Sequence, residues 1–360
     1  MATLLKNLYD ERYIEVISNE IKNNFPNFKK NEFKKIIFDN EWSKKELKQR
    51  MRHISESLGK FLPKKYENAV FILQNTFENT DKKFRIENMI FQDFVEVYGL
   101  DNFEISMKAL EIFTIESSSE FAIRQFIIKY PQATMHQMKR WALSNNEHVR
   151  RLASEGCRPR LPWAVALNDF KNNPKVVIEI LELLKDDTSD YVRKSVANNI
   201  NDISKDNPDI TLKLIKKWLG YSKNRDKLLK HGCRTLLKAQ NSEALELFGL
   251  KPAFHVEIKN LVIQKKVKLG EVLEFGFELY SQQSLGLLRI EYQMEFLRKN
   301  NKYSKKVFKI SESQVTNKFK KVVKKHSFKP ISTRKYYVGK QKLNIIINGQ
   351  IVAKMVFYIC

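Results

Sequence analysis

The sequence predicts a mainly helical protein, built as an α-solenoid, that ends in an all-β sandwich. Up to about residue 250 the apolar residues recur every three or four positions, as in Val192, Val196 and Ile200, which is the period of a helix. After residues 250–252 apolar and polar residues alternate, as in residues 254–258, which is the period of a strand. The change of period predicts a helical domain over residues 1–250 and a sandwich domain over residues 251–360.

Composition sets the class of protein. The 360 residues are 42% hydrophobic and 29% charged, enough for two packed domains. The net charge of +24 favours a polyanionic partner such as nucleic acid. No apolar run is long enough to span a membrane and the first residues hold no apolar signal core, so we expect a cytoplasmic, nucleoid-associated protein without membrane contact. The three scattered cysteines are typical of reduced thiols.

A weak internal repeat runs through the helical part. Residues 122–124, 148–151 and 191–194 each place a basic residue after a β-branched one, early in a helical stretch. The last two repeats lie 43 residues apart, within the spacing of roughly 40–47 residues that HEAT or armadillo repeats show. Their arginines (Arg124, Arg150 and Arg193) either point into a concave, phosphate-binding face or pair with neighbouring turns and carboxylates; the register of three favours a basic groove.

The sequence pattern of the C-terminal part predicts short strands. Expected strands lie around residues 254–258, 273–279, 288–292, 307–310, 343–347 and 351–359, and Asn348-Gly349 is a strong hairpin turn. Six or seven strands in this length favour an antiparallel sandwich. Residues 251–360 hold 23 basic and 7 acidic residues, a net of +16. The densest run, residues 318–325, is either a solubilising strand face or a phosphate contact.

One segment, residues 147–163, combines the groups that a reaction needs. It contains Arg150, Arg151, Arg158 and Arg160 around one acid, Glu155, and one aromatic, Trp163. An acid among arginines is commonly a structural ion pair. A carboxylate beside a large aromatic in a phosphate-binding groove also suits the stabilisation of a cationic sugar, with the aromatic holding a cationic base.

Two further acids occupy similar places in the neighbouring repeats. Glu120 follows three serines and precedes the 122–124 step, so capping a helix N-terminus is the simple alternative for it. Asp202 follows the helix that contains Arg193 and Lys194, so a cap at the C-terminus of that helix or in the loop after it is the simple alternative for it. Together with Glu155 the two acids predict a composite pocket near the ends of neighbouring inner helices.

Other chemistries have little support. The six histidines show no metal-ligand spacing, and the sequence contains no Cys-x-x-Cys pair, no glycine-rich phosphate loop and no nucleophile elbow. We therefore expect neither a metal nor a cofactor. Cys233 follows His231 by two positions, so the two do not face each other on a helix and Cys233 is expected in the core.

The sequence resembles the AlkC branch of the HEAT-like-repeat DNA glycosylases. The resemblance covers nearly the whole chain and is carried by residues 41–58, 89–100, 117–126 and 148–163 and by the C-terminal strands. The ordered run SEG-RPRLPW within residues 148–163 is its most specific part. The resemblance implies a HEAT-like-repeat glycosylase domain followed by an immunoglobulin-like domain that contacts DNA.

The resemblance also implies an activity, hydrolysis of the N-glycosidic bond of cationic lesions such as N3-methyladenine and N3-methylcytosine in double-stranded DNA. Glu155, Glu120 and Asp202 would be the pocket acids, and Trp163 would pack on the lesion. The phosphate ligands would be Arg124, Arg150, Arg151, Arg158, Arg160, Arg193 and Lys194. It does not assign which acid contacts the sugar and which aligns the water, although Glu155 is the first candidate. It further suggests recognition without a deep base-flipping pocket, by a monomer.

Two alternatives remain open at this point. A non-catalytic HEAT-repeat nucleic-acid binder would keep the acids as structural ion pairs, although a carboxylate that repels phosphate has no use in a pure binder. A protein-binding solenoid is disfavoured by the positive charge unless its partner is acidic. A steep loss of affinity with salt would separate nucleic-acid binding from protein binding.

Overall fold

The computed structural model describes residues 4–331 and 334–360, which form two compact units. The first unit holds the chain up to residue 207 together with residues 218–232, and the second holds residues 208–217 and 233–360. The last helix ends at Leu247 and the first strand begins at Glu257, so the secondary structure changes where the period of the sequence changes. The boundary between the two compact units does not coincide with this change from helices to strands, because three short helical segments group with the strands. No helix in the described ranges is long and apolar enough to cross a membrane.

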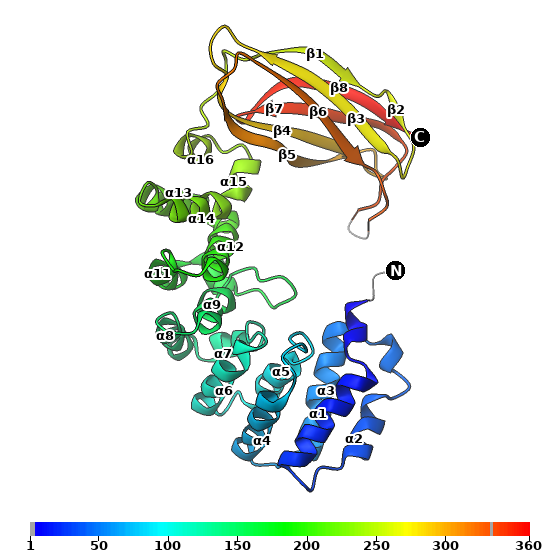
Figure 1. Ribbon diagram of the computed structural model, residues 1–360, viewed down its shortest axis with the longest axis vertical. Helices are drawn as coiled ribbons and strands as arrows, with labels where there is room; N and C mark the ends of the chain where they lie inside the picture. Colours follow the sequence, from blue (N-terminus) through cyan, green and yellow to red (C-terminus); the bar gives the residue numbers. More distant parts are fainter. Residues whose placement is uncertain (1–3, 332–333) are drawn as a thin grey trace. The chain divides into compact units, whose positions relative to one another are not determined.

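The helical part is a succession of short α-helices. Figure 1 shows those of the first unit lying one after another along the chain. Two 3-10 turns, η1 (Leu5–Leu8) and η2 (Trp42–Lys44), occur near the start. The helices are α1 (Glu11–Asn24), α2 (Lys30–Ile37), α3 (Leu47–Phe61), α4 (Tyr66–Asn79), α5 (Met89–Tyr98), α6 (Phe103–Ile115), α7 (Ile123–Lys129), α8 (Pro131–Trp141), α9 (Glu147–Gly156), α10 (Asn168–Asn172), α11 (Lys175–Leu184), α12 (Asp190–Asp206), α13 (Pro208–Trp218), α14 (Lys223–Gly232), α15 (Arg234–Lys238) and α16 (Ser242–Leu247).

The repeat predicted from the sequence corresponds to three helices of the first unit. Its β-branched residues, Ile123 of α7, Val149 of α9 and Val192 of α12, are all fully or almost fully buried. Helix α9 packs against α8, α11 and α12, and α12 packs in turn against α14. Each helix thus buries its apolar stripe against the next repeat, which is how a solenoid builds a continuous core.

The strands of the second unit form two sheets (Figure 1). The three-stranded sheet has the order β1-β3-β6 and the five-stranded sheet the order β2-β8-β7-β4-β5. The strands are β1 (Glu257–Ile263), β2 (Lys266–Val267), β3 (Val272–Tyr280), β4 (Gly286–Leu297), β5 (Tyr303–Val315), β6 (Phe319–Ser327), β7 (Gly339–Ile347) and β8 (Gln350–Ile359). The pairs are antiparallel except for the short β2, which runs parallel to β8.

The predicted sandwich is confirmed, with two adjustments. The expected hairpin joins β7 to β8, and Asn348 and Gly349 have φ values of 45° and 82°, as this tight turn requires. The first strand begins three residues later than its alternation suggested, because residues 254–256 form the turn that leads into it. The two-residue β2 is too short for a period to be recognised in the sequence. Alternate residues of the longer strands, among them Phe275 and Ile345, fill the core between the sheets.

Candidate active site in the helical unit

Helix α9 carries the arginine-rich segment and ends beside its neighbours. The Asn146 side chain accepts a hydrogen bond from the His148 amide at 2.9 Å and caps the helix start. At the other end, a Cβ on Gly156 would lie 2.7 Å from Cγ2 of Ile123 and 2.9 Å from Cε of Met138. Glycine therefore lets α9 approach α7 and α8 closely. This approach places Glu155, in the last turn of α9, between two neighbouring repeats.

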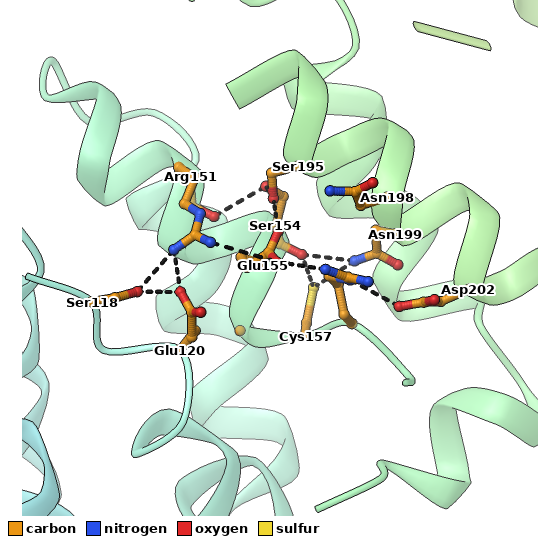
Figure 2. A network of polar contacts seen from close by, with 12 residues as sticks. Ser118, Glu120, Arg151, Ser154, Glu155, Cys157, Ser195, Asn198, Asn199 and Asp202 are labelled. Atoms are coloured by element: carbon orange, nitrogen blue, oxygen red, sulfur yellow. Dashed lines mark hydrogen bonds and ion pairs between the residues drawn. The ribbon is translucent and has the colours of Figure 1, made fainter. Parts of the chain in front are cut away.

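Glu155 is the centre of the polar network in Figure 2. Its side chain is buried, and its Oε1 accepts a hydrogen bond from Nη1 of Arg158 at 2.6 Å. Ser195 of α12 donates to Oε2 at 2.7 Å and itself accepts from Ser154 at 2.6 Å. The guanidinium of Arg151 lies 3.5 Å from Oε1. Both carboxylate oxygens are thus held in a fixed orientation, one by Arg158 in the loop after α9 and the other by Ser195 of α12.

Asp202 joins the same network through Arg158. Nε of Arg158 donates to Oδ2 of Asp202 at 2.8 Å, and Lys205 donates to Oδ1 at 2.9 Å. Asp202 does not follow the helix, as the sequence suggested, because α12 continues to Asp206 and Asp202 is buried near the C-terminal end of α12. Burial disfavours the charge of Arg158, but Glu155 and Asp202 outweigh this effect and raise the pKa of Arg158.

Glu120 completes the network on the opposite side. Its carboxylate pairs with Arg151 and accepts a hydrogen bond from Ser118, whose hydroxyl also accepts from Arg151 at 2.8 Å. Burial opposes the charge of Arg151, yet the carboxylates of Glu120 and Glu155 raise its pKa. The three predicted acids therefore lie on one chain of contacts, in the order Glu120, Arg151, Glu155, Arg158 and Asp202 (Figure 2). Two arginines link the acids and keep the negative charges apart.

Trp163 lies in the loop that follows α9. The residue has a φ of 63° and its side chain is 68% exposed. A left-handed backbone is unfavourable for a tryptophan, so neighbouring contacts must hold it. Lys48 of α3 supplies one of them by donating to the Trp163 carbonyl oxygen at 3.0 Å. Trp163, Glu120 and Glu155 all line one cavity of about 340 Å³. The structure thus brings the predicted aromatic and two of the predicted acids to a common space.

Arg124 is not placed to bind phosphate, contrary to the sequence prediction. Its side chain is completely buried, and its Nε donates to the carbonyl of Val165 at 2.7 Å. Its Nη1 donates to the carbonyls of Gly156 at 3.0 Å and Arg158 at 2.8 Å. Burial lowers the pKa of Arg124 to about 10, so the group stays charged at neutral pH. Arg124 fastens both ends of the loop that carries Trp163.

The remaining cations differ in how accessible they are. Arg158 is buried between Glu155 and Asp202 and lines the cavity, and its role as a phosphate ligand stays a prediction. The other repeat arginines make local contacts: Arg150 with Asp187 and the carbonyls of residues 144 and 145, and Arg193 with Asp190 and the carbonyls of residues 187 and 188.

Arg160 and Lys194 are the outermost of the predicted phosphate ligands. The side chain of Arg160 is 40% exposed while paired with Asp206, and Lys194 is exposed. Arg151 is half-buried within the acid network. In these helices a Val-Arg step thus serves the fold more often than it faces solvent.

Several members of the site were missed by the sequence reasoning. Ser154, Ser195 and Asn199 fix the helix pair, since Asn199 donates to the Ser154 carbonyl at 2.8 Å. Lys48 and Ser118 lie in stretches that carry the family resemblance, which was the available signal for them. In residues 4–331 and 334–360 no group of three or more His, Cys, Asp or Glu side chains is arranged to hold a metal ion.

Comparison with known proteins finds relatives of both the helical part and the sandwich. Residues 107–243 match the family model described as DNA alkylation repair enzyme, and residues 257–360 match that of the C-terminal Ig-like domain of protein YhaZ. The chain is 41% identical to the uncharacterized protein YhaZ of Bacillus subtilis, over 99% of both chains. It also matches the alkylpurine DNA glycosylase AlkC of Pseudomonas fluorescens, solved with DNA containing an abasic-site analogue, with a TM-score of 0.94 and 32% identity over 99% of this chain and 100% of that one. The chain therefore belongs to the AlkC-like DNA alkylation repair enzyme family and carries the YhaZ-type Ig-like domain at its C-terminus.

Proposed function

We propose that this protein is a DNA glycosylase that removes cationic alkylated bases, N3-methyladenine and N3-methylcytosine, by hydrolysing the N-glycosidic bond. The observation that carries the proposal is the linked set of Glu120, Glu155 and Asp202, three acids from three repeats, of which Glu120 and Glu155 line one cavity with Trp163. The AlkC relative, an alkylpurine DNA glycosylase bound to DNA, supports the same reaction.

The chemistry suits fixed carboxylates. When the bond between C1′ and the base nitrogen breaks, both electrons go to the base and neutralise its positive charge, so the leaving group needs no proton from the enzyme. The sugar becomes an oxocarbenium-like cation, which a nearby carboxylate stabilises electrostatically. Water then adds to C1′ and gives up a proton, and a second carboxylate can orient the water and accept that proton. We assign these two tasks to the pocket acids.

Glu155 is the first candidate for the sugar-facing acid. Its two oxygens are oriented by Arg158 and Ser195, so its charge need not reorganise as the sugar cation forms. The same contacts are what a purely structural carboxylate would make, and activity has to separate the two roles. Glu120 and Asp202 remain candidates for positioning the water. Trp163, with most of its indole exposed, would stack on the damaged nucleotide.

Contacts with the DNA backbone would come from both units. In the helical unit we propose Arg160 and Lys194 as the direct phosphate ligands, with the half-buried Arg150, Arg151 and Arg193 adding to the local positive potential. In the sandwich unit, cations from three separate segments line one hollow: Arg298, Lys299, Lys305, Lys306, Arg334 and Lys335. Such a cluster is the electrostatic footprint of a phosphate-binding surface.

The basic hollow is a stronger candidate than the lysine-rich run at residues 318–325. Lys325 of that run lies 3.2 Å from Glu274, and Lys321 lies near Glu278, so carboxylates of β3 partly neutralise it. Its outward lysines also alternate with inward-facing residues of β6, as a solubilising strand face would. We therefore place the DNA contact of the Ig-like domain at the hollow.

The test is release of free bases from DNA methylated in vitro, measured by chromatography with the full-length protein and with Glu155→Gln. We expect the native protein to release methyladenine and methylcytosine, and the variant to lose turnover while its DNA affinity stays equal or rises. Glu179→Gln, which disturbs an ion pair with Lys139 elsewhere in the helical unit, is the matched control and should release bases normally. DNA binding without base release by the native protein would instead identify a non-catalytic binder.

A further inference from the structure

The turn that carries Trp163 holds an unusual residue for its backbone shape. The Ala164 amide donates to the carbonyl oxygen of Leu161 at 3.3 Å and closes a four-residue turn. Pro162 stands second in this turn, where its ring fixes φ, and Trp163 stands third with a φ of 63°. A type II turn requires a positive φ at its third position, which glycine or asparagine normally occupies. The chain thus accepts a strained backbone at the point where it presents an indole.

The carbonyl oxygen of Trp163 receives a hydrogen bond from a helix that is distant in the sequence. The ammonium group of Lys48, in the first turn of α3, donates to it at 3.0 Å. The same ammonium group lies 4.5 Å from the centre of the Phe121 ring, which is close enough for a cation–π contact. Phe121 follows Glu120 directly in the chain. Lys48 therefore links the turn that presents Trp163 to the segment that presents one of the pocket acids.

The charge of Lys48 is balanced within the wall of the cavity. The wall holds two carboxylates and two cations: Glu120, Glu155, Lys48 and Arg158. A wall without net charge stabilises a cation only where a carboxylate faces it, so the proposed reaction depends on how the groups are placed and not on their sum. Because the ammonium group of Lys48 is bonded to a carbonyl oxygen of the turn, the contribution of Lys48 is to this placement.

Two acids within electrostatic reach of Lys48 are bonded to another cation. Arg52, one helical turn further along α3, donates to Asp93 at 2.9 Å and to Glu96 at 2.6 Å, and both acids belong to α5. Those carboxylates therefore do not draw Lys48 away from the turn. The side chain of Lys48 is itself exposed, so its contacts with Trp163 and Phe121 set its position, and burial does not.

We propose that Lys48 is a positioning residue, which keeps the turn in its strained conformation and thereby holds the Trp163 indole at the cavity that Glu120 lines. This inference rests on the proposed glycosylase function, in which Trp163 stacks on the damaged nucleotide. Without the ammonium donor the turn can relax towards the negative φ that a tryptophan favours, and the indole then leaves its place for part of the time. The enzyme–DNA complex spends less time in the reactive arrangement, so base release slows while DNA affinity changes little.

The experiment measures the single-turnover rate of base release from DNA methylated in vitro, with the full-length protein in excess over the DNA. Lys48→Met keeps most of the side-chain length and removes the donor, and it should slow release about 3- to 10-fold, the factor that corresponds to one net hydrogen bond. Lys60→Met, at an exposed lysine of α3 that does not line the cavity, is the matched control and should release bases at the native rate. DNA affinity and its salt dependence should be the same in the two variants.

A second substitution shows whether Lys48 acts through the indole. Trp163→Ala removes the ring and should itself slow release. Adding Lys48→Met to Trp163→Ala should then change the rate by less than about twofold, because the effects of two residues that act through one group do not add. The rate of spontaneous release from the same DNA is subtracted from each measurement.

The outcomes separate the inference from the function beneath it. An equal loss from Lys48→Met in the native and Trp163→Ala backgrounds would overturn the inference, and so would release by either single variant at the native rate. Weaker DNA binding by Lys48→Met than by Lys60→Met, with a slope of log affinity against log salt reduced by about one, would identify a phosphate ligand instead. Failure of the native protein to release any methylated base would refute the proposed function itself.

Discussion

Replacing Arg124 by methionine tests how the candidate site is held together. The substitution keeps most of the side-chain length but removes the donors that bind the carbonyls of Gly156, Arg158 and Val165. Each buried carbonyl left without a donor costs about 1–3 kcal/mol. The variant regains part of this loss, because the burial that lowers the pKa of Arg124 to about 10 costs the native state about 3 kcal/mol. With a cost of about 2 kcal/mol for each of the two buried carbonyls, and less for the part-buried carbonyl of Val165, the net loss is about 1–3 kcal/mol.

The assay is urea-induced unfolding followed through tryptophan fluorescence, combined with DNA binding at several salt concentrations. We expect the Arg124→Met variant to unfold at lower urea, and its fluorescence to report a changed environment of the exposed Trp163 even before unfolding. The slope of log affinity against log salt should stay at the native value, since no phosphate contact is lost. Arg124→Lys, which keeps the charge, should recover part of the stability.

The opposite result would revive the sequence-based interpretation of Arg124 as a phosphate ligand. Unchanged unfolding, together with weaker DNA binding and a salt slope reduced by about one, is the signature of a lost phosphate contact. Such a result would show that the three carbonyl contacts of Arg124 contribute little to the fold, and the reasoning above would be refuted.

Three other outcomes follow from the structure. Lys299→Glu, in the basic hollow, should weaken DNA binding and reduce the slope of log affinity against log salt. Lys321→Glu on β6 should have a smaller effect, and equal effects of the two variants in a gel-shift titration would argue against DNA binding at the hollow. Burial and neighbouring cations lower the pKa of His326 to about 4. The contribution of the neutral imidazole to the free energy of unfolding is therefore fully present above the ordinary pKa near 6.5 and is lost as the pH falls through 4. The free energy of unfolding of the sandwich should fall by up to about 3 kcal/mol over that pH range, and by less in the His326→Phe variant. If the variant showed the same pH dependence as the native protein, His326 would not be the group responsible. Gly156→Ala should destabilise the helical unit by about 1–3 kcal/mol, and Ile123→Ala should cost less stability in the Gly156→Ala background than in the native protein. Thermal unfolding of Gly156→Ala without any change would show that α9 can move away at little cost.

The sequence predicted the elements more reliably than the contacts. Period and turn chemistry are local, so the change from helices to strands and the Asn348-Gly349 hairpin could be read directly. The spacing of the repeats also brought Glu120, Glu155 and Asp202 into one neighbourhood. The division into compact units could not be read in this way, because the grouping of α13 with the strands depends on packing between distant segments.

The arginines show why side-chain roles were harder to predict. Arg124, Arg150 and Arg193 occupy the same position in their repeats, and the sequence alone does not say whether such a position faces solvent. The answer depends on which carbonyls a neighbouring loop presents: Arg124 meets the carbonyls of residues 156, 158 and 165, while Arg193 meets those of residues 187 and 188. The positions of those loops depend on tertiary structure, so no local sequence pattern indicated that Arg124 is buried.

The alternation of acids and arginines explains how one site can hold three carboxylates, as the proposed reaction of a cationic base requires. Three unlinked carboxylates in a buried space would repel one another and favour protonated forms, which stabilise a sugar cation poorly. Arg151 and Arg158 each lie between two of the acids and offset this repulsion. Arg158 lines the cavity together with Glu120 and Glu155, whereas Arg151 does not. In the proposed reaction, the contacts with Arg151, Arg158 and Ser195 would hold Glu120 and Glu155 in fixed orientations while the sugar cation forms.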